Sequence, residues 1–244
     1  MRRQALRLLL PISAGFLLAA CSGADAERAS QLLATAQAAQ AKLVSATYDA
    51  RVVITQGDQS FTLFMNGGGY LKGPRAGDQF MSMKADGLPV PMQFDLVSVN
   101  GHAVARINGT SQSFTMPSGA GSEGSNWTGI VGDLARYVKS VDVRERTVVA
   151  GEAGTTVAGV IDTAGLVKAV AGLSTLSRAT GTPSVDELAK HLGDTRVILF
   201  ISSRTHLIRT AVVNVDVKAD GKSTKLQLFY TLRTVNRPVA IPQA

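Results

Sequence analysis

The two long segments that end the chain alternate apolar and polar residues one by one, and this pattern restricts the folds open to it. The apolar positions of the segments 207–218 and 225–235 are Ala211, Val213, Val215 and Val217, and Leu226, Leu228, Tyr230 and Leu232. Because successive side chains of a β-strand point to opposite faces, each segment is predicted to be a strand with one apolar and one polar face. Such strands are typical of an antiparallel sheet that buries a single face.

The same alternation occurs in the first half of the chain. It predicts two hairpins, over 47–66 and 92–108, and the second has Asn100-Gly101 at its tip, a pair that favours a type I′ turn. The glycine run 67–69 is expected to end a strand. Helical periodicity predicts helices over 27–47, 128–140, 163–176 and 184–192.

Long runs of strands with grouped helices favour an α+β fold, in which helices cover one face of a sheet. We expect one curved antiparallel sheet, a half-open β-barrel, with helices packed on its concave face. No internal repeat or second-domain linker divides the chain, and the polar segment 117–126, rich in glycine and serine, is predicted to be a loop. Residues 27–244 are therefore predicted to form a single domain.

The N-terminus has the pattern of an export signal. Three arginines within the first seven residues precede an apolar stretch over 8–18, and two alanines follow. The sequence LAAC at 18–21 matches a bacterial lipobox and contains the only cysteine of the chain, Cys21. The prediction is a signal peptide over 1–20, followed by an acylated Cys21 and a tether over 21–26. An ordinary signal peptide with a chance cysteine after it is the alternative.

This N-terminus also predicts where the protein works. Two or three fatty acyl chains on Cys21 would hold it durably on the extracytoplasmic face of the cell membrane, or on the periplasmic side if an outer membrane is present. The formal net charge of +7 includes the three arginines of the signal. The mild positive balance that is left suits a protein beside anionic lipid headgroups, and equally a merely soluble surface.

Residues with catalytic or metal-binding chemistry are sparse. His102, His191 and His206 are far apart in the sequence and form no metal-binding motif. The segment 119–124 matches the glycine pattern of dinucleotide-binding loops, but no buried strand precedes it and no βαβ unit surrounds it. The basic residues are dispersed, which argues against nucleic acid as a partner. The chain is therefore predicted not to be an enzyme and to hold no metal and no cofactor.

Flexible apolar side chains are concentrated in the segment 61–116. Five methionines and five phenylalanines lie there. Methionine adapts to irregular apolar partners because its side chain is unbranched and polarizable. These residues either form an ordinary core or line an apolar surface on the concave side of the sheet.

Several segments resemble those of a known family. In AKLVSATYDARVVIT, residues 41–55, a helix is expected to lead into the first strand through Leu43, Ser45, Ala46 and Tyr48. Asn126-Trp127 follows a polar loop, and the closing strands VILFISSRTHLIRTAVVNV and LRTVNRPVAIP complete the pattern. Together with the lipobox, this order resembles the actinobacterial LppX/LprA/LprF/LprG lipoproteins, whose fold is similar to that of the LolA/LolB lipoprotein carriers. The resemblance implies a LolA-like fold with an apolar cavity, which binds acylated lipids or glycolipids and carries them in the cell envelope.

Strand parity selects the residues expected to line that cavity. They are Val52, Ile54, Phe61, Leu63, Met65, Phe94, Leu96, Val213, Val215, Leu226, Leu228 and Tyr230. Trp127 is expected at the cavity rim. The expected partners are an acylated lipid or glycolipid, the membrane through the N-terminal anchor, and an envelope transporter; the chain itself is expected to be a monomer. Two alternatives stay open: a sensor module that binds a membrane protein, and a structural envelope lipoprotein with a filled interior.

Overall fold

The computed structural model describes residues 23–87, 91–115, 131, 137–162, 192–219 and 222–243, and every structural statement below refers to them. They contain helix α1 and strands β1 to β11. The bounds are α1 Gly23–Gln40, β1 Ser45–Gln56, β2 Gln59–Tyr70, β3 Gln79–Asp86, β4 Met92–Val99, β5 His102–Ile107, β6 Thr110–Thr115, β7 Val138–Val149, β8 Glu152–Ile161, β9 Leu192–Ser202, β10 Ile208–Ala219 and β11 Lys222–Val235.

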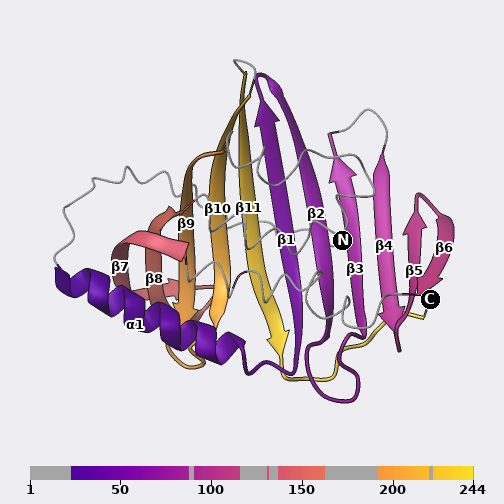
Figure 1. Cartoon of the computed structure of the whole chain (residues 1–244), viewed down its shortest axis with the longest axis horizontal. Coiled ribbons are helices and arrows are strands. Elements are labelled where there is room, and N and C mark those ends of the chain that lie inside the picture. Colours follow the sequence, from indigo (N-terminus) through magenta and orange to yellow (C-terminus); the bar gives the residue numbers. More distant parts are fainter. Residues whose placement is uncertain are drawn as a thin grey trace, which may run out of the picture.

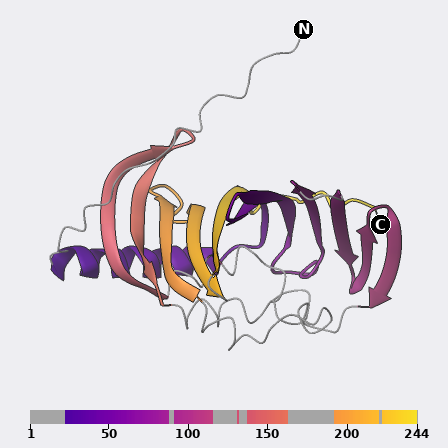
Figure 2. The same ribbon diagram turned by 90° about the horizontal axis from the view of Figure 1, so that it is seen from above.

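The eleven strands form one antiparallel sheet in the order β6-β5-β4-β3-β2-β1-β11-β10-β9-β8-β7. Strands that are consecutive in sequence are neighbours, except β6 and β7, which form the two edges. The first and last strands, β1 and β11, pair with each other in the middle of the sheet. The sheet curves and its two edges stay apart (Figure 1, Figure 2). The predicted curved, half-open antiparallel sheet is therefore confirmed.

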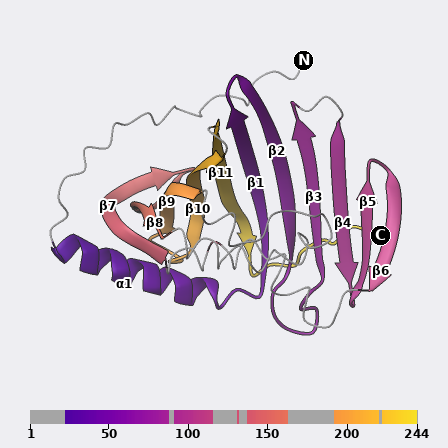
Figure 3. The same cartoon turned by 45° about the horizontal axis from the view of Figure 1, so that its top comes forward.

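The two faces of the sheet differ in composition. On β1, alternate residues are buried: Ala46, Tyr48, Ala50 and Val52. Helix α1 runs along the β7–β10 half of the sheet (Figure 3). It packs Ala29, Leu33 and Ala36 into the same cluster as those β1 residues. We call the face that α1 covers the inner face, and the opposite one the outer face.

The bounds of α1 differ from the expected helix over 27–47. The helix begins at Gly23, inside the segment expected to be a tether, and ends at Gln40. It ends early because Val44 is bound by two distant segments. The Val44 amide donates to the Asn236 side chain at 2.8 Å. The Val44 carbonyl accepts the Leu71 amide at 2.7 Å.

The glycine run 67–69 was expected to end a strand but lies inside β2. A Cβ atom added to Gly67 would lie 2.6 Å from the Tyr48 hydroxyl oxygen, and one added to Gly69 would lie 2.4 Å from the Asp78 carbonyl oxygen. The glycines therefore allow neighbouring groups to approach β2 closely, a recognised role of glycine within strands.

The helices expected in the second half of the chain are only partly within the described residues. Val131 is helical, but residues 138–140 belong to β7, which pairs with β8 from Val138 onward. The helix expected over 163–176 lies outside the described residues. So does the one over 184–192, apart from Leu192, which begins β9.

Candidate functional site

The pairing register places all twelve residues expected to line a cavity on the inner face. Directly opposed residues of antiparallel strands share a face. Val52 lies between Leu63 and Leu228, and Ile54 lies between Phe61 and Leu226. The remaining six follow from the same register, through their partners on β1, β3, β10 and β11: Met65, Phe94, Leu96, Val213, Val215 and Tyr230. That these residues bind a ligand stays a prediction.

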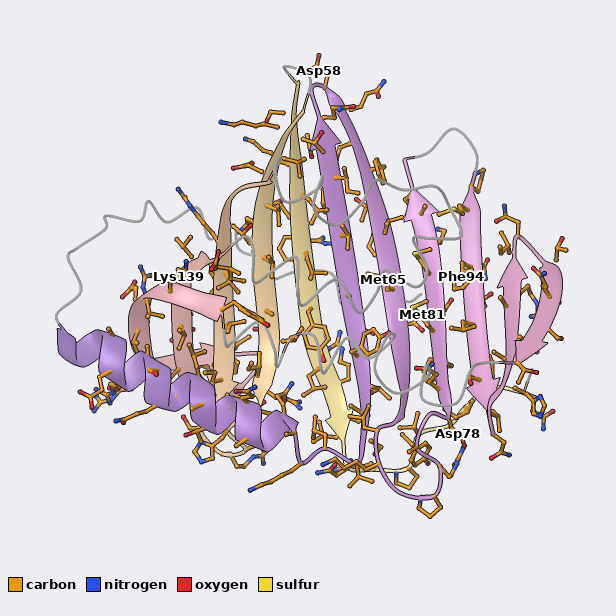
Figure 4. The ribbon with its side chains drawn as sticks, viewed as in Figure 1. Asp58, Met65, Asp78, Met81, Phe94 and Lys139 are labelled. Carbon is orange, nitrogen blue, oxygen red and sulfur yellow. The ribbon has the colours of Figure 1, made fainter. Side chains whose placement is uncertain are left out.

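Sequence reasoning missed other residues on this face. Met81 and Met83 of β3 lie opposite Leu96 and Phe94 of β4. Figure 4 shows Met65, Met81 and Phe94 beside one another on three adjacent strands. The alternation of Met81 and Met83 with Ser82 and Lys84 is the sequence signal that indicates a shared face for the two methionines.

The inner face has two parts that differ in burial. Under α1, the side chains of β8 to β11 form a packed core, and Leu199, Val157, Val197, Tyr230 and Leu232 are exposed by 1% or less. On β2 to β4 this face is only partly closed: Met65, Ala85 and Leu96 are buried, whereas five apolar side chains are half-buried, namely Phe61, Leu63, Met81, Met83 and Phe94. We call these five residues the open apolar surface. A surface of this kind can accept an apolar ligand without first breaking a packed core.

Two tyrosines lie between these parts. Tyr48 and Tyr230 stack with ring centroids 5.9 Å apart and an interplanar angle of 26°. Gly67 lies against the hydroxyl end of Tyr48. Burial raises the pKa of Tyr48 well above its usual value, and the nearby Tyr230 raises this pKa further. Tyr48 is therefore uncharged across the physiological range.

Replacing Tyr48 by phenylalanine should change the alkaline stability of the chain. Because the folded-state pKa of Tyr48 is raised, its contribution to stability is fully present below about pH 10 and is lost as pH rises above it. The free energy of unfolding of the unaltered chain should therefore fall more steeply than that of Tyr48→Phe, by up to about 1.4 kcal/mol per pH unit. Urea denaturation at pH 8 to 11.5 measures this difference. Equal slopes for the two proteins would contradict it.

The described part of the inner face has few polar groups. Thr195 of β9 is fully buried, and its hydroxyl has no hydrogen-bond partner. The described residues include no group of three or more His, Cys, Asp or Glu side chains that could hold a metal ion. His102 and His206 are exposed and far apart in the sheet, His102 at the start of β5 and His206 in the connection between β9 and β10.

Two predicted residues, Cys21 and Trp127, lie outside the described part of the chain. The structure therefore leaves the acylation site and the cavity rim as predictions. In the part that it describes, no helix is both long and apolar enough to span a lipid bilayer.

The sheet order, its open edges and the single face covered by α1 define a LolA-like fold. No family model and no curated protein matches the sequence. Among solved structures, LprF from Mycobacterium bovis shares this fold, with a TM-score of 0.50 and 17% identity over 89% of this chain and 97% of LprF. The Mycobacterium tuberculosis lipoprotein LppX is similar with a TM-score of 0.49 and 16% identity, over 88% of this chain and 99% of LppX. The resemblance found in the sequence is thus confirmed at the level of the fold.

Proposed function

We propose that this chain binds an acylated lipid or glycolipid against its open apolar surface and carries it in the cell envelope. The observation that carries the proposal is the contrast within one face: the β8–β11 part is a packed core, whereas Leu63, Met83 and Phe94 are only half-buried. An apolar surface left partly open beside a finished core is available for a ligand.

The chemistry of the surface suits acyl chains. Methionine and phenylalanine dominate it, and methionine side chains repack around apolar ligands of varied shape. Moving an acyl chain out of water gains about 0.8 kcal/mol per CH₂, so a chain of about 15 carbons gains on the order of 10 kcal/mol. This gain requires no catalytic group, and the proposed role is therefore carriage without a reaction.

The proposed anchor would place the surface where lipids are found. Helix α1 begins two residues after Cys21. Acyl chains on Cys21 would therefore attach the helix end directly to the membrane, with almost no intervening tether. The domain would work at the extracytoplasmic face and would meet its lipid, and any envelope transporter, in that layer.

Native mass spectrometry tests the proposal. The mature chain from residue 21, with Cys21→Ser to exclude acylation, is expressed in a bacterial host and purified without detergent. We expect a stoichiometric adduct that is released on denaturation and is identified as a phospholipid or glycolipid. A bare protein mass that stays bare after incubation with a membrane extract would overturn the proposal and favour a structural or sensor protein.

A further inference from the structure

One edge of the sheet carries a group of cations around an exposed apolar side chain. Three segments meet there, at the lower edge in Figure 1: the end of α1 with residues 41–44, the connection 71–78 between β2 and β3, and residues 236–237 after β11. Their exposed side chains include Lys42, Val44, Lys72, Arg75 and Arg237. We call these five residues the basic platform.

Hydrogen bonds join the three segments into one surface. The Val44 amide donates to the Asn236 side chain at 2.8 Å, and the Asn236 amide donates to the Ser45 carbonyl at 2.9 Å. The Ser45 hydroxyl donates to the Arg237 carbonyl at 2.6 Å. The Lys72 ammonium donates to the Ala41 carbonyl at the end of α1. The three segments of the platform are therefore held together through their backbone, which keeps the residues that carry its charges close to one another.

The acidic residue in this region is buried and paired. The Asp78 carboxylate accepts the Arg75 guanidinium at 2.9 Å and the Asn100 amide at 2.9 Å. The Arg75 guanidinium also lies over the Tyr70 ring, 4.2 Å from its centroid. The Tyr70 hydroxyl accepts the Val239 amide at 3.0 Å. Asp78, labelled at the lower edge in Figure 4, thus supports the platform from beneath and adds no exposed negative charge.

The two ends of the sheet differ in charge. In the described connections at the platform's edge, every exposed charged side chain is a cation: Lys42, Lys72, Arg75, Arg204 and Arg237. The described connections of the opposite edge contain Asp58 and Asp162 and no lysine or arginine. The exposed charges in the connections of the platform's edge are therefore all positive, whereas the opposite edge carries both signs, since exposed Lys84 and Lys225 lie on strands near it.

We propose that the basic platform docks on an anionic lipid surface. Clustered lysine and arginine side chains are attracted to anionic headgroups, and an apolar residue among them can enter the headgroup layer. Val44 is 46% exposed and lies between Lys42 and the segment of Lys72. Helix α1 runs from the end nearest Cys21 to the platform, so an acylated Cys21 and the platform could face one membrane together. This inference does not depend on lipid binding by the open apolar surface.

Vesicle flotation tests the platform separately from the anchor. The chain from residue 21 with Cys21→Ser contains every described residue and carries no acyl group. We expect it to float with vesicles of phosphatidylcholine and phosphatidylglycerol (7:3), to bind pure phosphatidylcholine far less, and to be released by 0.5 M NaCl because salt screens exposed charges. Lys42→Glu/Arg237→Glu should weaken binding by at least roughly 30-fold, since each cation lost near the surface lowers the affinity about fivefold and the two new carboxylates add repulsion.

The matched control is Lys84→Glu/Lys225→Glu, which makes the same change of charge towards the opposite edge and should change binding less than threefold. Leu63→Asp/Phe94→Asp, which targets the open apolar surface, should still float with the anionic vesicles. Equal loss in the platform variant and its control would overturn the proposal. Failure of the Cys21→Ser chain without further substitutions to bind the anionic vesicles would also overturn the proposal. An acidic protein would then be the better candidate for this surface.

Discussion

A chain carrying Leu63→Asp and Phe94→Asp should purify as a folded protein without bound lipid. Both residues belong to the open apolar surface on the inner face, on β2 and β4. A lipid bound over either aspartate would bury its carboxylate without a partner, which costs several kcal/mol. This cost is comparable to a large part of the free energy gained when one acyl chain leaves water. Because both side chains are half-buried in the folded protein, the new carboxylates can keep water contact when no ligand is bound. Native mass spectrometry should therefore show loss of the adduct, from one per chain to almost none.

The matched control for this variant is Phe64→Asp/Gln93→Asp. These residues adjoin Leu63 and Phe94 in sequence but lie on the outer face and are exposed. The control adds the same charge to the same strands and should retain the adduct. Circular dichroism and thermal unfolding establish that both variants fold. If the folded inner-face variant keeps its lipid at full stoichiometry, the open apolar surface is not the binding site.

The strands in which apolar and polar residues alternate regularly were the part of the fold best predicted from the sequence. Strands β10 and β11 and the β4–β5 hairpin follow directly from it, and the hairpin tip has the positive φ angles expected for Asn100 and Gly101, 52° and 78°. The twelve residues selected by the same parity share one face in the pairing register, and that they line a cavity stays a prediction. This is possible because a strand's side-chain period is a local property of the backbone.

Features that depend on distant contacts could not be read from the sequence. The pairing of β1 with β11 joins residues such as Ala50 and Tyr230, which no local pattern connects. The segment that follows α1 is bound at Val44 by Asn236, from beyond the last strand, and by Leu71. The platform likewise brings together three segments whose individual charges are unremarkable in the sequence, since only the fold makes them neighbours.

The place of the glycine run 67–69 inside β2 also depends on distant contacts. Glycine disfavours strands locally, yet β2 requires it here. Gly67 lies opposite Tyr48 on β1. A Cβ atom at Gly67 would lie 2.6 Å from the Tyr48 hydroxyl oxygen and 2.9 Å from the Phe80 carbonyl oxygen. The stacked position of Tyr48 on Tyr230 therefore depends on the absence of a side chain here.

Replacing Gly67 by valine should lower the free energy of unfolding by about 3 kcal/mol, because overpacking forces Tyr48 from its stack and pushes β2 from β3. Urea denaturation measures the loss, and Asn66→Val, an exposed neighbour on the same strand, is the control and should change stability by less than about 0.5 kcal/mol. Tyr48→Ala should relieve part of the clash, so the Gly67→Val/Tyr48→Ala double variant should lose less than the sum of the two single losses. Strict additivity would show that Gly67 does not hold Tyr48 in place, and that the glycine run serves the approach of the neighbouring backbone alone.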